Sequence, residues 1–319
     1  MAKQRRTLPL EASGWAVLAR CVALVVFSFS GALHAEEGIQ VSQVRNNIYL
    51  LVSPAGGNVV AMTGTDGVFM VDTQLPGRSA KVEEAISEVS SQPIRYVLNT
   101  HYHSDHTGGN THFGDKGPVI IAQENVRKRL SNRQFISYFN REMLPLPKVG
   151  LPSLTFTTDM TLYQNGEEIR LFNLSAAHTD GDAGAFFANA NVLVTGDTVS
   201  NGSYPFIDVE HGGSIKGMLK AAEVFLSIAN EGTTIIPGHG QPMNKTELQA
   251  YHDMIATIED RIETAVEAGK TLEQVLAAKP TQEFDAKMKK GIVSGDALTN
   301  LAYEDLAERR RRRLHGTTH

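Results

Sequence analysis

The stretch Asn99-Thr100-His101-Tyr102-His103-Ser104-Asp105-His106-Thr107-Gly108-Gly109-Asn110 places three histidines and one carboxylate within six consecutive positions. It directly follows a mainly apolar run, residues 94–98, which is typical of a buried strand. A strand end delivers side chains to the rim of a sheet, where sites in α/β proteins form. Imidazole and carboxylate suit zinc when no thiolate is offered. The stretch therefore predicts a metal site, with a solvated, histidine-rich loop as the alternative.

Three more potential ligands lie far along the chain, each just past a strand-like run. His178 follows the run 169–174, and Asp197 and His239 close runs of their own. Any one of them alone fits a polar residue whose hydrogen bonds are satisfied within the fold. Three such placements after the first cluster favour a single shared site.

The pattern His-x-His-x-Asp-His, followed by a distant His, Asp and His, resembles the metallo-β-lactamase superfamily over about residues 41–245. The resemblance implies a four-layer αββα sandwich with two metal ions at one edge, between the two sheets. It also implies the role of each ligand. The first ion would be held by His101, His103 and His178, the second by Asp105, His106 and His239, and Asp197 would bridge both.

Two zinc ions per chain are the expected cofactor, although iron and manganese also accept these ligands. Such a pair lowers the pKa of water and polarises a carbonyl group. Asp105 is the predicted catalytic residue, because it would both ligate metal and orient the nucleophile or carry its proton. No Gly-x-Ser-x-Gly sequence is present, so nothing indicates a serine nucleophile.

Ligating histidines usually donate their second ring N–H to a carboxylate or carbonyl. Asp72, Thr195 and Asp182 are the candidates for this orienting role, with a turn or cap role as the alternative. Tyr102 and Asn110 are candidate substrate contacts at the rim of the site, although an aromatic residue between two ligands can equally pack inside the protein.

The stretch at residues 201–206 follows the predicted bridging aspartate and is expected to form one wall of the pocket. His211 is a candidate for lining the same pocket. The remaining histidines are not expected to bind metal. They are His112, predicted at the surface or behind the ligands, and His252, His315 and His319, predicted to be solvated.

The first 35 residues predict a cleaved export signal. Lys3 and the Arg5-Arg6 pair give a basic start, an apolar run covers residues 21–29, and Ala35 offers a cleavage point. A membrane anchor is the alternative, but a spanning helix needs roughly 20 apolar residues, and this run is shorter. The mature protein is therefore expected in the periplasm or secreted, with general and twin-arginine export both open.

The composition of the mature chain restricts its chemistry. Cys21, the only cysteine, lies in the predicted signal, so neither a disulfide nor a thiolate ligand is expected. The signal carries four basic side chains and one acidic one, so removing it takes the formal charge from −5 to −8. An acidic protein gives no reason to expect nucleic acid. The expected partner is a small-molecule substrate, with no stable membrane insertion after cleavage.

The mature chain mixes strand-like and helix-like runs, which predicts an α/β fold of two sheets flanked by helices. The expected strands are residues 44–52, 59–62, 68–71, 94–98, 155–163, 169–174, 184–188, 192–194 and 233–236, with a hairpin turn at residues 64–67. The expected helices are residues 79–90, 124–140 and 214–228.

From residue 244 the pattern is helical to the end. Asn244 and Glu247 resemble a capping box, Gly269 should end the first helix, and Thr271 should cap a short second one. Five arginines at residues 309–313 predict a solvated, frayed terminus, with contact to an anionic lipid or polymer as the alternative. The predicted domains are a signal at 1–35, a metallo-hydrolase core at 36–245 and a helical extension at 246–319 that packs on the core.

Neither the fold nor the metal ligands identify the substrate. Many β-lactamases of this superfamily have a Cys at the position of Asp197 and a Lys three positions later, where this chain has Ser200. The bridging aspartate is closer to the glyoxalase II and lactonase branch. Predicted export argues for a β-lactam, because these compounds act outside the cytoplasm.

The sequence therefore predicts an exported binuclear zinc hydrolase that opens a small cyclic amide or ester, with a β-lactam favoured. A lactonase or a thioesterase of the glyoxalase II type is one alternative. A non-catalytic periplasmic metal-binding or redox-partner protein is the alternative from another class.

Overall fold

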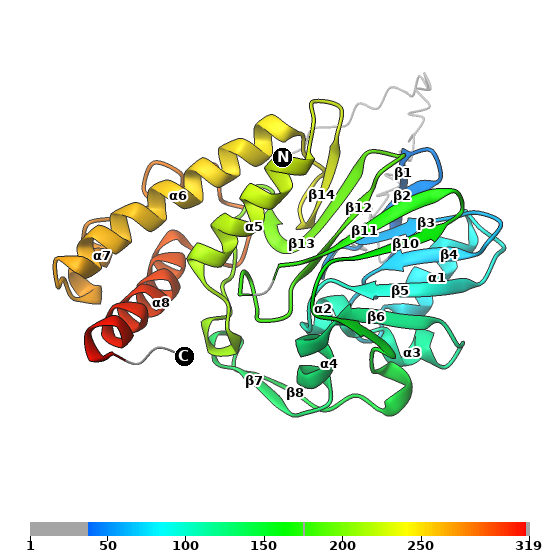
Figure 1. Ribbon diagram of the computed structural model, residues 1–319, viewed down its shortest axis with the longest axis horizontal. Coiled ribbons are helices and arrows are strands. Elements are labelled where there is room, and N and C mark those ends of the chain that lie inside the picture. The colour runs from blue at the N-terminus through cyan, green and yellow to red at the C-terminus, as the bar shows by residue number, and fades with distance from the viewer. Residues whose placement is uncertain (1–37, 175, 317–319) are drawn as a thin grey trace, which may run out of the picture. The chain divides into compact units, whose positions relative to one another are not determined.

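The computed structural model describes residues 38–174 and 176–316. Contacts divide the chain into Met1–Ala35 and Glu36–His319, and the predicted signal, with Cys21, lies outside the described residues. The second unit contains two large sheets and one small hairpin (Figure 1). Among the described residues, no helix is both long and apolar enough to span a bilayer.

The first sheet has seven strands in the order β1-β2-β3-β4-β5-β6-β9. The β3–β4 hairpin turns at residues 64–67, as predicted, and the Gly67 N–H donates to the Gly64 carbonyl at 3.1 Å. From β4 onward the strands are parallel, so their C-terminal ends share one edge. The strands are β1 (Gln40–Arg45), β2 (Ile48–Val52), β3 (Val59–Met62), β4 (Val68–Val71), β5 (Ile94–Asn99), β6 (Val119–Gln123) and β9 (Leu154–Phe156).

The second sheet has five strands in the order β10-β11-β12-β13-β14. Only β13 and β14 are parallel, and helix α5 (Ile215–Ile228) connects them. The strands are β10 (Met160–Gln164), β11 (Glu167–Asn173), β12 (Ala183–Phe187), β13 (Val192–Ser200) and β14 (Thr234–His239).

The single strand predicted at residues 155–163 is wrong, because the chain there supplies one strand to each sheet. β9 pairs with β6, and β10 pairs with β11. Between them the Asp159 carboxylate accepts the backbone N–H of Asn173 at 2.9 Å, which anchors the crossing chain to the second sheet. Local hydrophobicity marks extended chain but does not say which sheet a strand joins.

Four layers result, and the predicted αββα sandwich is confirmed. Helices α1 (Ser79–Ser87) and α3 (Asn110–Gly114) cover the first sheet, and α5 with α6 (Lys245–Glu267) covers the second (Figure 1). Phe69 and Phe187 meet between the sheets, edge to face, with ring centroids 6.0 Å apart. Fully burying such a side chain stabilises a fold by about 1.5–3 kcal/mol.

The helix predicted at residues 124–140 is wrong beyond Leu130. Helix α4 (Glu124–Leu130) ends there, and a hairpin of β7 (Gln134–Ile136) and β8 (Arg141–Met143) follows. A 3₁₀ turn (Ser137–Phe139) joins the two strands, and Asn140 adopts a left-handed φ of 47°. Aromatic and β-branched residues favour strands, and asparagine tolerates the left-handed turn.

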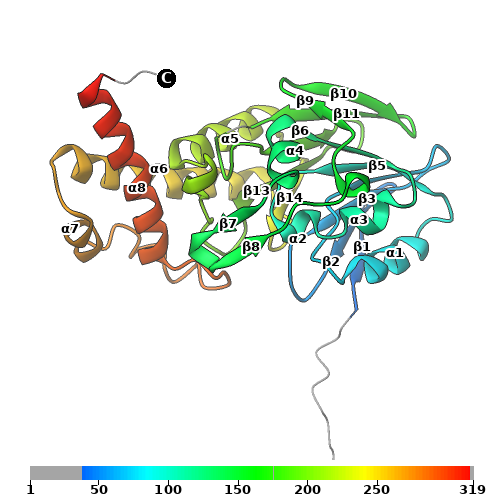
Figure 2. The same cartoon turned by 90° about the horizontal axis from the view of Figure 1, so that it is seen from below.

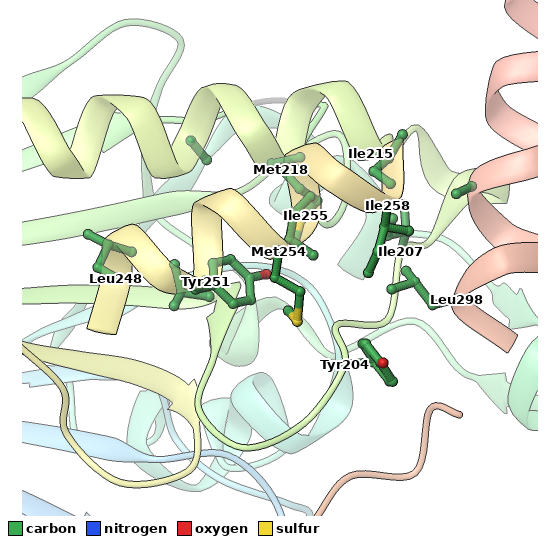
Figure 3. Packing of buried hydrophobic residues seen from close by; sticks show 14 of the residues in the cluster. Tyr204, Ile207, Ile215, Met218, Leu248, Tyr251, Met254, Ile255, Ile258 and Leu298 are labelled. Atoms are coloured by element: carbon green, nitrogen blue, oxygen red, sulfur yellow. The ribbon is translucent and has the colours of Figure 1, made fainter. Parts of the chain in front are cut away.

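The C-terminal helices form one apolar cluster with α5 and the second sheet. Figure 3 shows Met218 of α5 and Ile255 and Ile258 of α6 within it. Both predicted capping arrangements are confirmed, at Asn244 with Glu247 and at Thr271 with Gln274.

The prediction that the chain is helical from residue 244 to its end is wrong in one segment. A non-helical segment, residues 278–294, separates α7 (Leu272–Ala277) from α8 (Gly295–His315). Lys279 takes a left-handed φ of 50° and Pro280 follows it, so the backbone leaves the helical path there.

The five arginines at residues 309–313 belong to α8, so the prediction of a frayed end is wrong. Arg309 pairs with Asp305 at 2.6 Å, and Arg312 pairs with Glu308 at 2.9 Å, both one helical turn earlier. Arg310 lies 3.6 Å from Glu267 of α6. Acidic side chains spaced at three and four positions support the helix, a pattern that the run of arginines by itself does not reveal.

Candidate metal centre

All seven predicted ligands meet at one edge of the sandwich. Their candidate ligand atoms form three overlapping groups, and the atoms within each group lie within 4.8 Å of one another. The groups are His101, His103 and His178; His101, His106 and Asp197; and Asp105, His106 and His239.

The topology explains this meeting. His101 and His103 follow the C-terminal end of β5, and helix α2 (Ser104–Thr107) carries Asp105 and His106. Asp197 lies in β13 and His239 ends β14, and these two strands are parallel neighbours. Gly238 is needed beside them, because a Cβ there would lie 1.9 Å from Asp197 Oδ1.

The first ligand group, His101, His103 and His178, is held by hydrogen bonds behind its rings. His103 Nε2 donates to Asp208 at 2.9 Å, and His178 Nδ1 donates to the Phe206 carbonyl at 2.7 Å. The remaining nitrogens, His103 Nδ1 and His178 Nε2, lie 2.9 Å apart. Both are therefore close enough together to bind one ion.

The second ligand group, Asp105, His106 and His239, is rich in negative charge. His106 Nδ1 donates to Asp72 at 2.8 Å, which leaves Nε2 at 3.2 Å from Asp197 Oδ1. His239 Nε2 lies 3.2 Å from Asp105 and 3.3 Å from Asp197. Asp197 therefore lies where one carboxylate can reach both groups.

The donor set fits a pair of zinc ions. His101 Nε2 and Asp197 Oδ1 are buried and make no hydrogen bond, an arrangement that costs about 1–3 kcal/mol for each group unless another partner compensates. Five imidazoles and two carboxylates are hard and borderline donors that suit this ion.

The pKa values of the histidines differ between the two groups. Burial, reinforced by His103, lowers the pKa of His178 to about 4. Burial also lowers the pKa of His101 well below its usual range, with His106 adding to the effect. Burial would lower the pKa of His239 too, but Asp197 and Asp105 outweigh it and raise that pKa to about 10.

Of the three predicted orienting residues, only Asp72 acts directly on a ring. Its carboxylate accepts His106 Nδ1 at 2.8 Å and the Thr100 hydroxyl at 2.8 Å. Thr100 Oγ1 lies 3.1 Å from His101 Nδ1, so Asp72 supports both ligand groups. Asp72 holds a left-handed φ of 62°, an uncommon conformation that aspartate tolerates.

The other two orienting predictions are wrong. The Thr195 hydroxyl donates to the Gly196 carbonyl, one residue away. Asp182 accepts the backbone N–H and the hydroxyl of Thr179 at 2.8 and 2.7 Å, so it shapes the loop that carries His178 without contacting the ring through its carboxylate.

Asp208 is the supporting residue that sequence reasoning missed. It is buried and accepts hydrogen bonds from Tyr102 Oη, His103 Nε2 and His211 Nδ1 at 2.6, 2.9 and 2.7 Å. Burial alone would raise its pKa, but His103 and His211 hold the pKa well below the usual range. The signal that was available is an acidic residue between the apolar Ile207 and Val209.

The predicted rim contacts at Tyr102 and Asn110 are also wrong. Tyr102 is fully buried and donates to Asp208. Asn110 is fully buried and hydrogen-bonded to Asn99. Both side chains therefore stabilise this part of the chain from inside through their hydrogen bonds.

The other described histidines lie away from the cavity or near the surface. His211 is buried against Asp208 and does not line the pocket. His112 lies near the surface and pairs with Glu83 at 2.9 Å, and His252 is partly exposed and hydrogen-bonded to Asp253. His315 is exposed, and His319 lies outside the described residues.

A cavity of about 700 Å³ opens above the ligands. Asp105, Asp197 and His239 line its floor. The predicted wall at residues 201–206 is confirmed, since Asn201, Ser203, Tyr204 and Phe206 line the cavity. The β7–β8 hairpin, the segment before α8, residues 54–56 and Leu75 also line the cavity, which the sequence had not indicated.

The family model of the metallo-beta-lactamase superfamily matches residues 52–239, which include all seven predicted ligands. The chain belongs to the metallo-beta-lactamase superfamily. Its curated relatives are distant. A "probable metallo-hydrolase" of Methanocaldococcus jannaschii is 26% identical over 207 residues, covering 61% of this chain and 88% of the relative.

A second relative is the 2,4-dinitroanisole O-demethylase subunit alpha of a Nocardioides species. It is 25% identical over 170 residues, or 52% of this chain. The match covers 48% of the relative, so the chain spans about half the length of that protein.

Two solved structures share the fold. A metallo-beta-lactamase from Pontibacter korlensis is 15% identical, with a TM-score of 0.57 over 68% of this chain and 99% of that one. The sec-alkylsulfatase Pisa1 from a Pseudomonas species is 17% identical, with a TM-score of 0.65 over 83% of this chain and 50% of that one.

Proposed function

We propose that the protein is an exported binuclear zinc hydrolase that opens a small cyclic amide or ester, with a β-lactam as the first candidate. The observation that carries this proposal is the meeting of seven imidazole and carboxylate ligands at one edge of the sandwich, where five of them line one open cavity. His101, His103 and His178 would hold one ion, and Asp105, His106 and His239 the other, with Asp197 between them.

The zinc ions, when bound, supply Lewis acidity, which lowers the pKa of water and polarises a carbonyl group. The chain supplies the orientation. The side chain of Asp105 is 26% exposed and borders the cavity. Burial alone would raise its pKa, but His106 and His239 hold it well below the usual range. Asp105 is therefore ionised at neutral pH and can accept a hydrogen bond from water or from a leaving group.

Two arguments support a β-lactam. The cavity of about 700 Å³ lies within the usual range of about 300–1,000 Å³ for sites that bind drug-sized molecules. The predicted export signal would place the protein where β-lactams act. Asp197, in place of a cysteine, favours a lactone or a thioester as the second candidate.

The deciding experiment is turnover of a chromogenic cephalosporin by the purified mature chain. Metal content should be determined on the same sample, with a chelated aliquot as the control. Zinc-dependent cleavage at two ions per chain supports the proposal. If fully metallated protein leaves the cephalosporin intact, the β-lactam assignment fails, and a lactone and a thioester are assayed next on the same preparation. Because one relative is named as a 2,4-dinitroanisole O-demethylase, an aryl methyl ether should be assayed as a fourth substrate in this panel.

The non-catalytic alternative requires a different control. In a hydrolase, His103→Ala should abolish turnover together with zinc at the first group. If the wild-type chain binds two ions and turns over no member of the panel, a metal-binding role is favoured.

Export is tested separately by determining the N-terminus of protein recovered from the periplasm. A mature chain that begins near Glu36 supports cleavage after Ala35, whereas an intact N-terminus contradicts it. Replacing Arg5 and Arg6 with lysine should block export only if the route is twin-arginine.

A further inference from the structure

Two cationic side chains border the cavity from segments outside the ligand loops. Arg141 lies on β8, and Lys290 lies in the segment before α8. Both are exposed, and neither forms an ion pair with another residue that the structure describes. Lysines and arginines elsewhere on this surface, such as Arg129 and Lys116, do find carboxylates. The rim of the cavity therefore carries two cationic side chains that form no ion pair within the described chain.

Lys290 is held at the cavity by its backbone. Its N–H donates to the Gly202 carbonyl at 3.1 Å, and the preceding residue bridges to Ser203. Tyr204 anchors the same segment, because its hydroxyl donates to Asp285 at 2.8 Å. The segment before α8 is thus fixed against the cavity wall formed by residues 201–206. It supplies Lys290 to the cavity, whereas the strand that carries Asp197 has Ser200 where many β-lactamases of the superfamily have a lysine.

An apolar surface connects the metal ligands with this rim. The ring of Phe206 lies 5.9 Å from those of His103 and His178, centroid to centroid. Its other neighbours are Tyr138 and Phe139 of the hairpin turn, at 5.1 and 4.8 Å. Tyr138 reaches the segment before α8 through a 3.4 Å hydrogen bond to the Ile292 carbonyl. In Figure 2 the hairpin and that segment lie near each other.

We propose that Arg141 and Lys290 bind the anionic group of an amphiphilic substrate, whose apolar part lies along Phe139 and Phe206 and whose scissile bond lies at the metal ligands. The proposal rests on the hydrolase function proposed above and names its substrate class, an ester or cyclic amide that carries a carboxylate or sulfonate. The charge arrangement supports it, because cations that line the same cavity beside an apolar wall attract and orient anions.

The kinetic test uses metal-loaded protein and a substrate in two forms, the free acid and its neutral methyl ester. The variants are Lys290→Ala, Arg141→Ala and both together, with Lys289→Ala as the matched control, because Lys289 does not line this cavity. KM for the acid should rise about fivefold in each single variant and more in the double variant, with kcat nearly unchanged. KM for the ester should stay constant. Equal changes for acid and ester would overturn the proposal.

A binding measurement separates this proposal from the function on which it rests. Isothermal titration of 4-phenylbutyrate, with 4-phenylbutyramide as the neutral comparison, is carried out on metal-loaded and on chelated protein. The acid should bind the chelated wild type more tightly than the amide does, and the double variant should lose the difference. A charge preference that survives in the double variant overturns the anion site, even if the enzyme is active. A preference that is lost in the double variant supports the site, even if no hydrolysis is found.

Discussion

The two ligand groups of the metal centre face one cavity but differ in exposure and in charge. The side chains of His101 and His178 are each 1% exposed, whereas those of His239 and Asp105 are 37% and 26% exposed. Asp197 lies 3.7 and 3.9 Å from rings of the first group, and 3.2 and 3.3 Å from rings of the second. The most exposed ligands, His239 and Asp105, thus belong to the second group, although His106 of that group is fully buried. His103 and His178 of the first group also line the cavity.

This difference predicts that the two groups bind their ions with different affinities. The rings of the first group are buried, and hydrogen bonds hold His103 and His178 from behind before an ion binds, so the first group should bind the ion more tightly. The second group carries charged side chains open to the cavity, so its ion should exchange more readily. Substitutions and changes of pH should therefore affect the two ions differently.

Ligand removal should give the largest effect. His103→Ala should lose the first ion and reduce turnover on the order of a thousandfold, because the orienting and polarising groups act together. His239→Ala should retain one ion per chain and part of the activity. Metal analysis and turnover on both variants check this prediction. If both variants lose both ions, the two groups bind as one unit and the contrast fails.

The pH dependence of metal binding should be the next largest effect. His239, with its pKa at about 10, is protonated at pH 7 in the metal-free protein, so an ion must displace that proton. Affinity at the second group should therefore rise up to about tenfold per pH unit between pH 7 and 9.

At the first group, His178, with its pKa at about 4, is already neutral at pH 7. Affinity there should change little over the same pH range. Zinc titrations against a competing chelator at pH 7, 8 and 9 measure both affinities. One common slope for the two ions would contradict the contrast.

Removing the carboxylate behind His103 should have a moderate effect. Asp208→Asn keeps the shape but weakens the acceptor of His103 Nε2, and such supporting residues are worth about 10–100-fold in metal affinity. The loss should appear at the first ion only. Asp305→Asn is the matched control, since it removes a buried carboxylate on α8 that pairs with Arg309. An equal loss in the control would mean that Asp208 acts through general stability.

The smallest effect is expected from Thr100→Val. The change breaks the link from His101 Nδ1 to Asp72 but leaves the direct bond from Asp72 to His106. One neutral hydrogen bond contributes about 1 kcal/mol, so affinity for the first ion should fall about fivefold and that for the second less. Chelator competition at fixed pH measures both, and a larger loss at the second ion would show that Asp72 cannot hold His106 without Thr100.

Sequence reasoning found the predicted ligands because each one lies within a few residues of the C-terminal end of a strand or in the loop and helix that follow it. Parallel strands align their C-terminal ends at one sheet edge, so ligands far apart in the sequence, such as Asp197 and His239, are brought together. Asp72 could be inferred in the same way, from its position just after β4.

Sequence-based predictions were wrong where the spacing of apolar residues is compatible with more than one type of secondary structure. The helix predicted at 124–140 and the single strand at 155–163 rested on apolar residues whose spacing fits either type of structure. Asp208 and Tyr102 were missed or misplaced for another reason. Their roles depend on which groups surround them after folding, and a satisfied buried carboxylate leaves almost no trace in a linear pattern.

The αββα layers and the seven residues that meet at the candidate metal centre could be predicted from the sequence alone. Both rest on local properties, namely periodic hydrophobicity and polar residues near strand ends, and the geometry of a sheet leaves few ways to arrange such strands in space. The groups that support the ligands and the charges that border the cavity became apparent only in the folded structure. Arg141 and Lys290 reach the cavity because a hairpin and a C-terminal segment fold back over it, and such long-range packing depends on contacts that no local pattern encodes.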